Sequence, residues 1–146
     1  MAKLAYTVSQ AGLEVPALIG VDGQMTTALV AAGRPVPPPV MVRALLDSGS
    51  SVTAIAPWVF QRLNLSSRGR ASTLTAAGQV GTNLFHVSLT ILPLGQLIGP
   101  TFTLPAVWAS ELSVVLPDAD VLIGLNVLLE CKLLLDGPAR AFFLEF

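Results

Sequence analysis

One acidic residue, Asp47, stands where a carboxylate could do chemistry on water. Two large apolar residues precede it, the small residues Ser48, Gly49 and Ser50 follow it, and another β-type run begins directly afterwards. This order predicts a carboxylate on a tight turn between two buried strands. A carboxylate held in such a turn can act as a general base that takes a proton from water.

The small neighbours of Asp47 each have a physical reason to be small. Short side chains let backbone N–H groups approach and hold the carboxylate oxygens. The Ser48 hydroxyl can brace the turn, and Gly49 admits a backbone shape that a side chain would block. Ser50 can donate a hydrogen bond to the carboxylate and orient it. The competing interpretation is an Asx-type turn that caps a hairpin, and the Asp-Ser-Gly triplet alone does not decide between the two.

A second motif lies late in the chain. The apolar run Asp120 to Gly124 predicts a short strand that ends in glycine, and Leu125 to Cys131 follows as a helical turn or two. Together with the Asp47 turn, this order resembles the retropepsin-like aspartic proteases, and the small cellular, bacterial-type members most closely. That family has an apolar-apolar-Asp-Ser/Thr-Gly loop, a glycine-bearing flap hairpin, and a late aliphatic strand that ends in glycine before a short helix. The resemblance covers roughly residues 15–146.

The resemblance implies roles for particular residues. Asp47, Ser48 and Gly49 would form the catalytic triplet, and Val121 to Gly124 would buttress it. A flap would close over the substrate, with its tip in a turn near Ala76 to Gly81. The implied substrate-binding residues are Ser50, Ala76, Ala77 and Gly78. Two features depart from the family pattern: the flap lacks the multi-glycine tip of viral enzymes, and Asn126 stands where many cellular members have Asp.

The resemblance also implies a mechanism. The chain has one Asp-Ser-Gly triplet, whereas the chemistry of this family uses two carboxylates facing one water. The implied protein is therefore a homodimer, in which Asp47 of each chain meets its copy at a two-fold axis. One carboxylate would activate the water and the other, protonated, would donate to the carbonyl oxygen of a peptide or protein substrate. No metal or cofactor is implied. The alternative is a catalytically weak module that binds peptides or dimerises.

The elements that would position these residues are mostly strands and turns, which predicts an all-β fold: a closed, retropepsin-like barrel with one or two short helices. We expect one domain over residues 1–146, with N-terminal strands or an arm in 1–35 and the catalytic core in 36–146. Met25 to Ala31 is expected to be a strand or an extended arm, and Pro57 to begin a short helix. The expected strands are Lys3 to Ser9, Val15 to Val21, Val40 to Leu46, Val52 to Ile55, two within Ala71 to Ile91, Phe102 to Trp108, Asp120 to Gly124, Leu133 to Leu135 and Ala141 to Phe146. The last strand could pair with its copy in a dimer or pack on its own barrel.

Composition and sequence context argue against several other functions. Hydrophobic residues make up 53% and charged residues 12% of the chain, with a mean hydropathy of +0.71. The uncharged stretch 71–110 is interrupted by prolines and glycines, which disfavours a membrane helix. The net charge is −1 and the basic residues are scattered, which argues against nucleic acid. The absence of a visible secretory signal and the lone Cys131 favour the cytoplasm. His86, the only histidine, lacks the sequence context of a serine hydrolase or a metal site.

Overall fold

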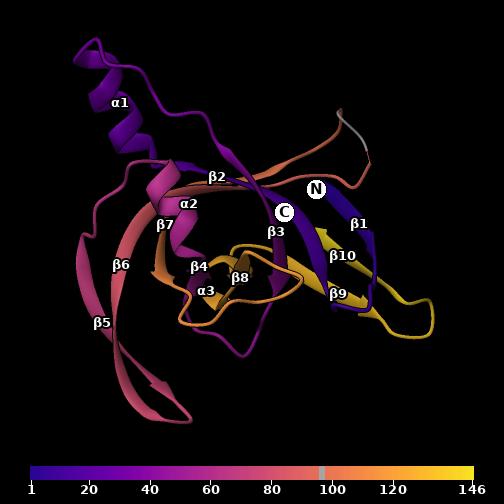
Figure 1. The fold of residues 1–146 in the computed structure, drawn as a ribbon. Helices are drawn as coiled ribbons and strands as arrows, with labels where there is room; N and C mark the ends of the chain where they lie inside the picture. The colour runs from indigo at the N-terminus through magenta and orange to yellow at the C-terminus, as the bar shows by residue number, and fades with distance from the viewer. Residues whose placement is uncertain (96–97) are drawn as a thin grey trace.

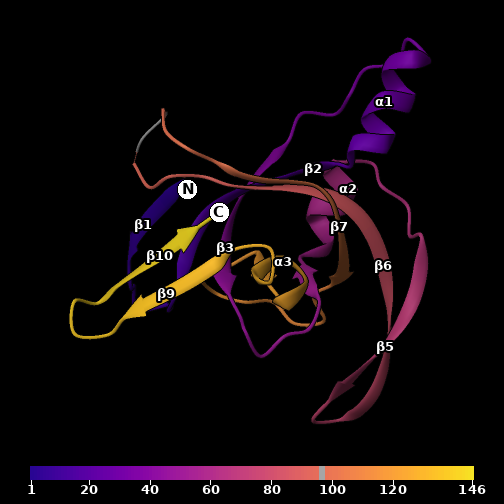
Figure 2. The same cartoon turned by 180° about the vertical axis from the view of Figure 1, so that it is seen from behind.

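The computed structural model describes residues 1–95 and 98–146 and is dominated by β-strands (Figure 1, and from behind in Figure 2). No helix within these residues is long and apolar enough to cross a bilayer. The strands are β1 (Lys3–Thr7), β2 (Glu14–Val21), β3 (Val40–Leu46), β4 (Thr53–Ile55), β5 (Gly69–Thr75), β6 (Gly78–Ile91), β7 (Phe102–Glu111), β8 (Val121–Ile123), β9 (Lys132–Asp136) and β10 (Ala141–Glu145). The helices are α1 (Gly23–Ala31), α2 (Pro57–Arg62) and α3 (Leu125–Leu128).

Six strands close into a barrel. They hydrogen-bond in the order β2-β3-β8-β4-β7-β6, and β6 pairs back to β2, while β5 extends the sheet beyond β6. The pairs β3–β8 and β4–β7 are parallel, and the other barrel pairs are antiparallel. Apolar side chains at alternate positions face inward, as in β6, where Phe85, Val87, Leu89 and Ile91 are buried. This period of two is the pattern that predicted the strands, and the closed all-β barrel is confirmed.

The C-terminal strand pairs within its own chain. It lies in the middle of a second sheet with the order β1-β10-β9, so both of its edges already have partners. Phe142 and Leu144 are fully buried, and Tyr6 stacks on Phe142 at 5.0 Å between ring centroids. The Tyr6 hydroxyl donates to the carbonyl oxygen of Leu92 at 2.7 Å, which joins this sheet to the end of β6. Of the two arrangements left open for this strand, packing on its own chain is the one adopted.

The segment Met25 to Ala31 is helical, and the expectation of a strand or extended arm there is wrong. Asp22 is the N-cap of α1, and its Oδ1 accepts a hydrogen bond from Met25 N at 2.6 Å. The Asp22-Gly23 pair therefore starts a helix. The helix buries no residue and projects from the barrel in both ribbon views (Figures 1 and 2). Its residues lack the period-two pattern of a half-buried strand.

Asp22 also joins α1 to the base of the β5–β6 hairpin. Its side chain is 2% exposed and its Oδ2 lies 2.8 Å from His86 Nδ1 and 3.4 Å from Arg68 Nη1. Burial alone would raise the pKa of this carboxyl group. The hydrogen bonds from Met25 N and His86, with the positive charges of His86 and Arg68, outweigh burial and lower the pKa below its ordinary value. His86 therefore has a structural partner.

We expect Asp22→Asn to lower the free energy of unfolding by about 2 kcal/mol at neutral pH, because it weakens a helix cap and a buried charge pair. A carboxyl group with a lowered folded-state pKa stabilises the protein above its unfolded pKa, which is about 3.9. That stability is lost as the pH falls through the folded-state pKa. Urea unfolding measured from about pH 7 down to about pH 2 should therefore show a smaller acid-dependent loss in the variant. Asp118→Asn, at an exposed position, is the control and should behave like wild type; equal slopes in all three proteins would refute the assignment.

Candidate active site

Asp47 lies on the loop that joins β3 to β4, which we call the Asp47 loop (residues 47–52). Its backbone N–H donates to Ile123 O at 2.9 Å, so the first residue of the loop is anchored to β8. Its side chain is half-buried, and Oδ1 accepts a hydrogen bond from Gly49 N at 3.0 Å. A Cβ atom at Gly49 would stand 3.2 Å from that same oxygen. The predicted turn between two strands is present, and a backbone N–H orients the carboxylate.

The bond from Gly49 N is also the bond of an Asx-turn, so the competing interpretation of the triplet describes the local geometry correctly. The turn does not cap a hairpin, however, because β3 and β4 both pair with β8 and not with each other. Ser48 is exposed. Ser50 Oγ donates to Val52 O at 2.7 Å, and a hydroxyl has one proton to give. The expectation that Ser50 donates to the carboxylate therefore differs from the structure, in which Ser50 braces the end of the loop.

Gly124, at the end of β8, packs directly against the Asp47 loop. A Cβ atom there would lie 2.7 Å from Val52 C, 2.8 Å from Ser50 O and 2.9 Å from Val52 O. All three are backbone atoms and cannot move away as the tip of a side chain could. The next residue continues the contact, since Leu125 N donates to Ser50 O at 2.8 Å. The absence of a side chain at position 124 is thus what lets the late strand and the Asp47 loop touch.

A partly buried polar cluster fastens α3 to the strands beside the loop. Asn126 Oδ1 accepts from both the N–H and the hydroxyl of Thr53, each at 2.9 Å. Asn126 Nδ2 donates to Trp108 O at 2.8 Å, and Gly124 N donates to Thr53 Oγ1 at 3.1 Å. Thr53 is fully buried. Sequence reasoning placed Asn126 after the strand but missed Thr53; the signal was a hydroxyl residue at an inward position of an apolar strand.

Thr53→Val is expected to lower the free energy of unfolding by about 1–3 kcal/mol, because the buried N–H of Gly124 loses its acceptor. The substitution conserves shape, so the loss reports the hydroxyl group. Thr7→Val, at an exposed position of β1, is the matched control and should change stability by less than about 0.5 kcal/mol. Chemical denaturation followed by tryptophan fluorescence measures both. Equal stabilities of the two variants would show that the Thr53 hydroxyl contributes nothing to the free energy of unfolding.

The β5–β6 hairpin projects beyond the barrel at the lower left of Figure 1. Thr75 lies opposite Gly78, so the turn consists of Ala76 and Ala77, and Gly78 has a φ of +109°. The turn predicted near Ala76 to Gly81 is thus present, and it occupies the first two residues of that range. Leu74 is 81% exposed and Val80 41%. An apolar hairpin tip that stands in solvent is available to contact a ligand.

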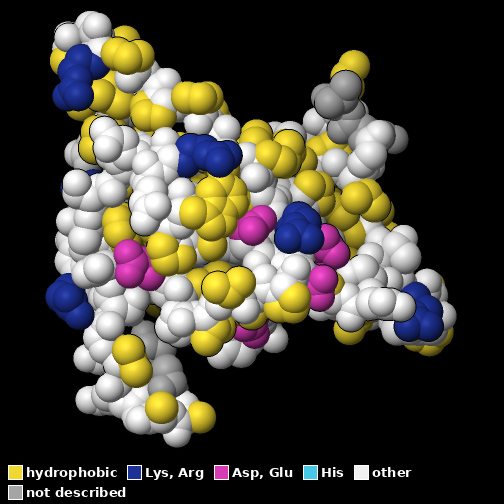
Figure 3. All heavy atoms as spheres, viewed as in Figure 1, with side chains coloured by type: hydrophobic (Ala, Val, Ile, Leu, Met, Phe, Trp, Pro, Cys, Tyr) yellow, Lys and Arg dark blue, Asp and Glu magenta, His cyan; other side chains and the backbone are white. Residues whose placement is uncertain are grey.

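The hairpin and the Asp47 loop enclose a cleft of about 620 Å³. Of the residues predicted for the site, Asp47, Gly49 and Ser50 line it; Ser48, Ala76, Ala77 and Gly78 do not. The opposite wall is the segment Ser110 to Ser113, at the end of β7. On the face drawn in Figure 3, the Lys and Arg side chains of the described residues lie apart from one another. Nothing on that face forms a basic patch of the kind that binds nucleic acid.

A closed β-barrel with an Asp-Ser-Gly loop, a glycine-ended strand against it and a projecting hairpin is the retropepsin-like arrangement. The sequence profile described as aspartyl protease matches residues 33–127, which is more than half of the chain. The chain belongs to the aspartyl protease family. Among solved structures, a retropepsin-like aspartic protease from Rickettsia conorii superposes with a TM-score of 0.59 at 13% identity, over 99% of this chain and 90% of that one. No curated protein matches the sequence. The predicted family and fold are confirmed.

Proposed function

We propose that this chain is one subunit of a homodimeric aspartic endopeptidase, in which Asp47 of each subunit flanks a shared hydrolytic water. The observation that carries the proposal is the position of Asp47. Its carboxylate is oriented by Gly49 N and lies in the cleft beneath a projecting hairpin. Membership of the aspartyl protease family supports the reaction class.

The chemistry follows from two carboxylates that share one proton. The ionised Asp47 takes a proton from water as the water oxygen attacks the peptide carbonyl carbon. The protonated Asp47 donates its proton to the carbonyl oxygen, which becomes a hydroxyl group of the neutral tetrahedral intermediate. The Asp47 that took the proton from water then gives it to the amide nitrogen, while the other Asp47 takes a proton back from a hydroxyl group of the intermediate. The C–N bond breaks and leaves a carboxylic acid and an amine. The β5–β6 hairpin would act as a flap, covering an extended peptide and excluding water.

We infer that the second carboxylate comes from another chain, because the other acidic residues nearby are differently placed. Asp120 Oδ2 accepts from Arg43 N at 3.1 Å, which holds it to β3. Asp118 is exposed and lies outside the cleft lining. Glu111 does line the cleft, but on the wall at the end of β7 and not on a turn like that of Asp47. Two copies related by a two-fold axis would supply a matched pair of turns.

Mixed dimers provide the sharpest test. Wild-type and Asp47→Asn chains, carrying different tags, are unfolded together and refolded at known ratios. The mixtures are then assayed with a mixed peptide library at mildly acidic pH. If each site needs both Asp47 residues, an equal mixture should retain about a quarter of wild-type activity, because only dimers of two wild-type chains are active. Retention of about half would mean that each chain works alone. Analytical ultracentrifugation should show a dimer at the assay concentration.

The competing function is a peptide-binding or dimerisation module with little turnover. It predicts that neither wild type nor Asp47→Asn cleaves the library, while both bind peptides in fluorescence anisotropy. Cleavage that depends on Asp47 excludes this alternative.

A further inference from the structure

Two charged side chains in the cleft have no part in the proposed hydrolysis. Besides Asp47, the ionisable residues of the described lining are Arg70, on β5, and Glu111, at the end of β7. Neither belongs to any ion pair found within residues 1–95 and 98–146, whereas the nearby Arg68 is paired with Asp22. Two opposite charges, each without an ionic partner among the described residues, therefore border the cleft.

The guanidinium group of Arg70 lies against the backbone of a glycine on the neighbouring strand β6. In the β5–β6 register Arg70 lies opposite Asn83, and Gly81 is the next residue of β6 on the same face. A Cβ atom at Gly81 would stand 2.9 Å from Arg70 Nη2, so the guanidinium group lies across the backbone at that point. A side chain at position 81 would displace it. Arg70 and Gly81 both line the cleft. Their contact therefore places a planar, permanently charged donor group at the cleft wall.

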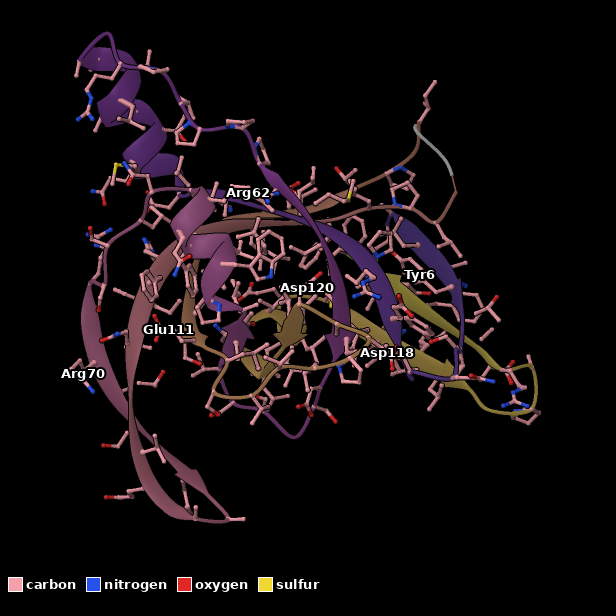
Figure 4. All side chains as sticks on the ribbon, in the orientation of Figure 1. Tyr6, Arg62, Arg70, Glu111, Asp118 and Asp120 are labelled. Atoms are coloured by element: carbon pink, nitrogen blue, oxygen red, sulfur yellow. The ribbon has the colours of Figure 1, made fainter. Side chains whose placement is uncertain are left out.

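Arg70 lies away from the hairpin tip. It precedes Leu74 by four residues of β5, a distance of roughly 13 Å along a strand. Figure 4 shows Arg70 at the outer edge of the hairpin. If the hairpin tip covers the bond to be cut, Arg70 meets a substrate side chain several positions away from that bond.

Glu111 is positioned by the barrel and not by the hairpin. It is the last residue of β7 and lies beside Ile55 in the parallel register of β4 and β7. The next residue is held to the same strand, because Leu112 N donates to Ile55 O at 2.9 Å. Ile55 is fully buried. Figure 4 shows Glu111 closer to the barrel than Arg70. A half-buried carboxylate in such a fixed position is suited to pair with a cationic side chain of a ligand.

We propose that Arg70 and Glu111 are specificity-determining residues, which select extended peptides that carry an acidic side chain opposite Arg70 and a basic side chain opposite Glu111. This inference rests on the proposed peptidase function, because it names the substrate class of that same cleft. Apart from these two residues and Asp47, the described lining of the cleft is uncharged and includes apolar residues such as Val52 and Leu74. The charged pair would then set where along a peptide the protein binds.

A charge-reversal series tests the inference. Peptides with Glu, Gln or Lys at each position in turn are cleaved by wild type, and the Glu/Lys ratio of kcat/KM is recorded per position. At one position the wild-type ratio should favour Glu, and Arg70→Glu should lower it by about tenfold or more. Arg70→Lys should keep most of the preference. Glu111→Lys should lower the preference for Lys at a different position. Both preferences should shrink in about 0.5 M salt.

Matched controls lie outside the cleft. Arg62, which stacks over Trp58, and the exposed Glu130 are replaced by Arg62→Glu and Glu130→Lys, which should leave every ratio unchanged. If Arg70→Glu and Glu111→Lys also leave every ratio unchanged, the inference is wrong while the peptidase stands.

The two residues could instead pair only with each other when the hairpin closes. The exchange Arg70→Glu with Glu111→Arg separates these cases. Mutual pairing predicts wild-type rates with unchanged preferences, which would overturn the inference; substrate recognition predicts inverted preferences at both positions.

Peptide binding separates this inference from the proposed function. If wild type cleaves nothing, the same peptides are titrated against Asp47→Asn by fluorescence anisotropy. Charge preferences that depend on Arg70 and Glu111 would support the inference although the peptidase proposal had failed. Binding without preference, or no binding, would overturn it.

Discussion

Asp47→Asn is expected to lower kcat for peptide cleavage by at least about a thousandfold, with little change in stability. An amide cannot take a proton from water or give one to a carbonyl oxygen, so both halves of the proposed mechanism fail. The Asn side chain still offers an oxygen to Gly49 N, which is the bond that shapes the turn. The fold is therefore expected to survive.

The measurement is single-turnover and steady-state cleavage of the best peptide from the library, with circular dichroism to show that the variant is folded. Asp118→Asn is the control, since Asp118 is exposed and outside the cleft lining, and it should retain full activity. Cleavage by Asp47→Asn at near wild-type rates would remove Asp47 from the mechanism and with it the proposed function.

Gly124→Ala should have the largest effect on stability, lowering the free energy of unfolding by about 3 kcal/mol or more. The added methyl group would meet three backbone atoms of Ser50 and Val52 at 2.7 to 2.9 Å. Gly124 has a φ of −92°, which alanine adopts without strain, so the loss reports the clash alone. Relief of the clash would push the Asp47 loop away from β8, and cleavage should therefore fall even where the variant is folded.

Gly137→Ala is the matched control. No atom lies within 4 Å of a Cβ built at Gly137, so stability should change by less than about 0.5 kcal/mol. Thermal and denaturant unfolding of the two variants measure the difference. Equal stabilities of Gly124→Ala and Gly137→Ala would mean that the late strand does not pack closely on the Asp47 loop.

The local features of the Asp47 region could be predicted because they depend on residue types close together in the chain. Aliphatic residues before Asp47 make β3, small residues after it make the turn, and Pro57 begins α2. The same is true of the glycine that ends β8. The misassigned helix α1 shows the weakness of such reasoning: Asp22-Gly23 suits a turn and a helix start equally well, and the residues that follow carry no strong period.

Contacts between distant segments were beyond local reasoning. Asn126 and Thr53 are 73 residues apart, and nothing in either neighbourhood specifies that one amide oxygen takes both Thr53 donors. The hydroxyl of Ser50 donates to Val52 O, an acceptor that the residue types around Asp47 did not indicate. Arg70 and Glu111 likewise belong to segments that no sequence motif connects, and they border one cleft because β6 pairs with both β5 and β7.

Residue types and their order were thus enough to place a carboxylate on a turn between two strands and to indicate the family. Both depend on short-range preferences that any chain with this sequence would have. Folding in three dimensions was needed to bring Gly124 against the backbone of the Asp47 loop and to put β10 between β1 and β9. Strand order and register arise from packing the whole core at once, and a segment read alone does not contain its partner.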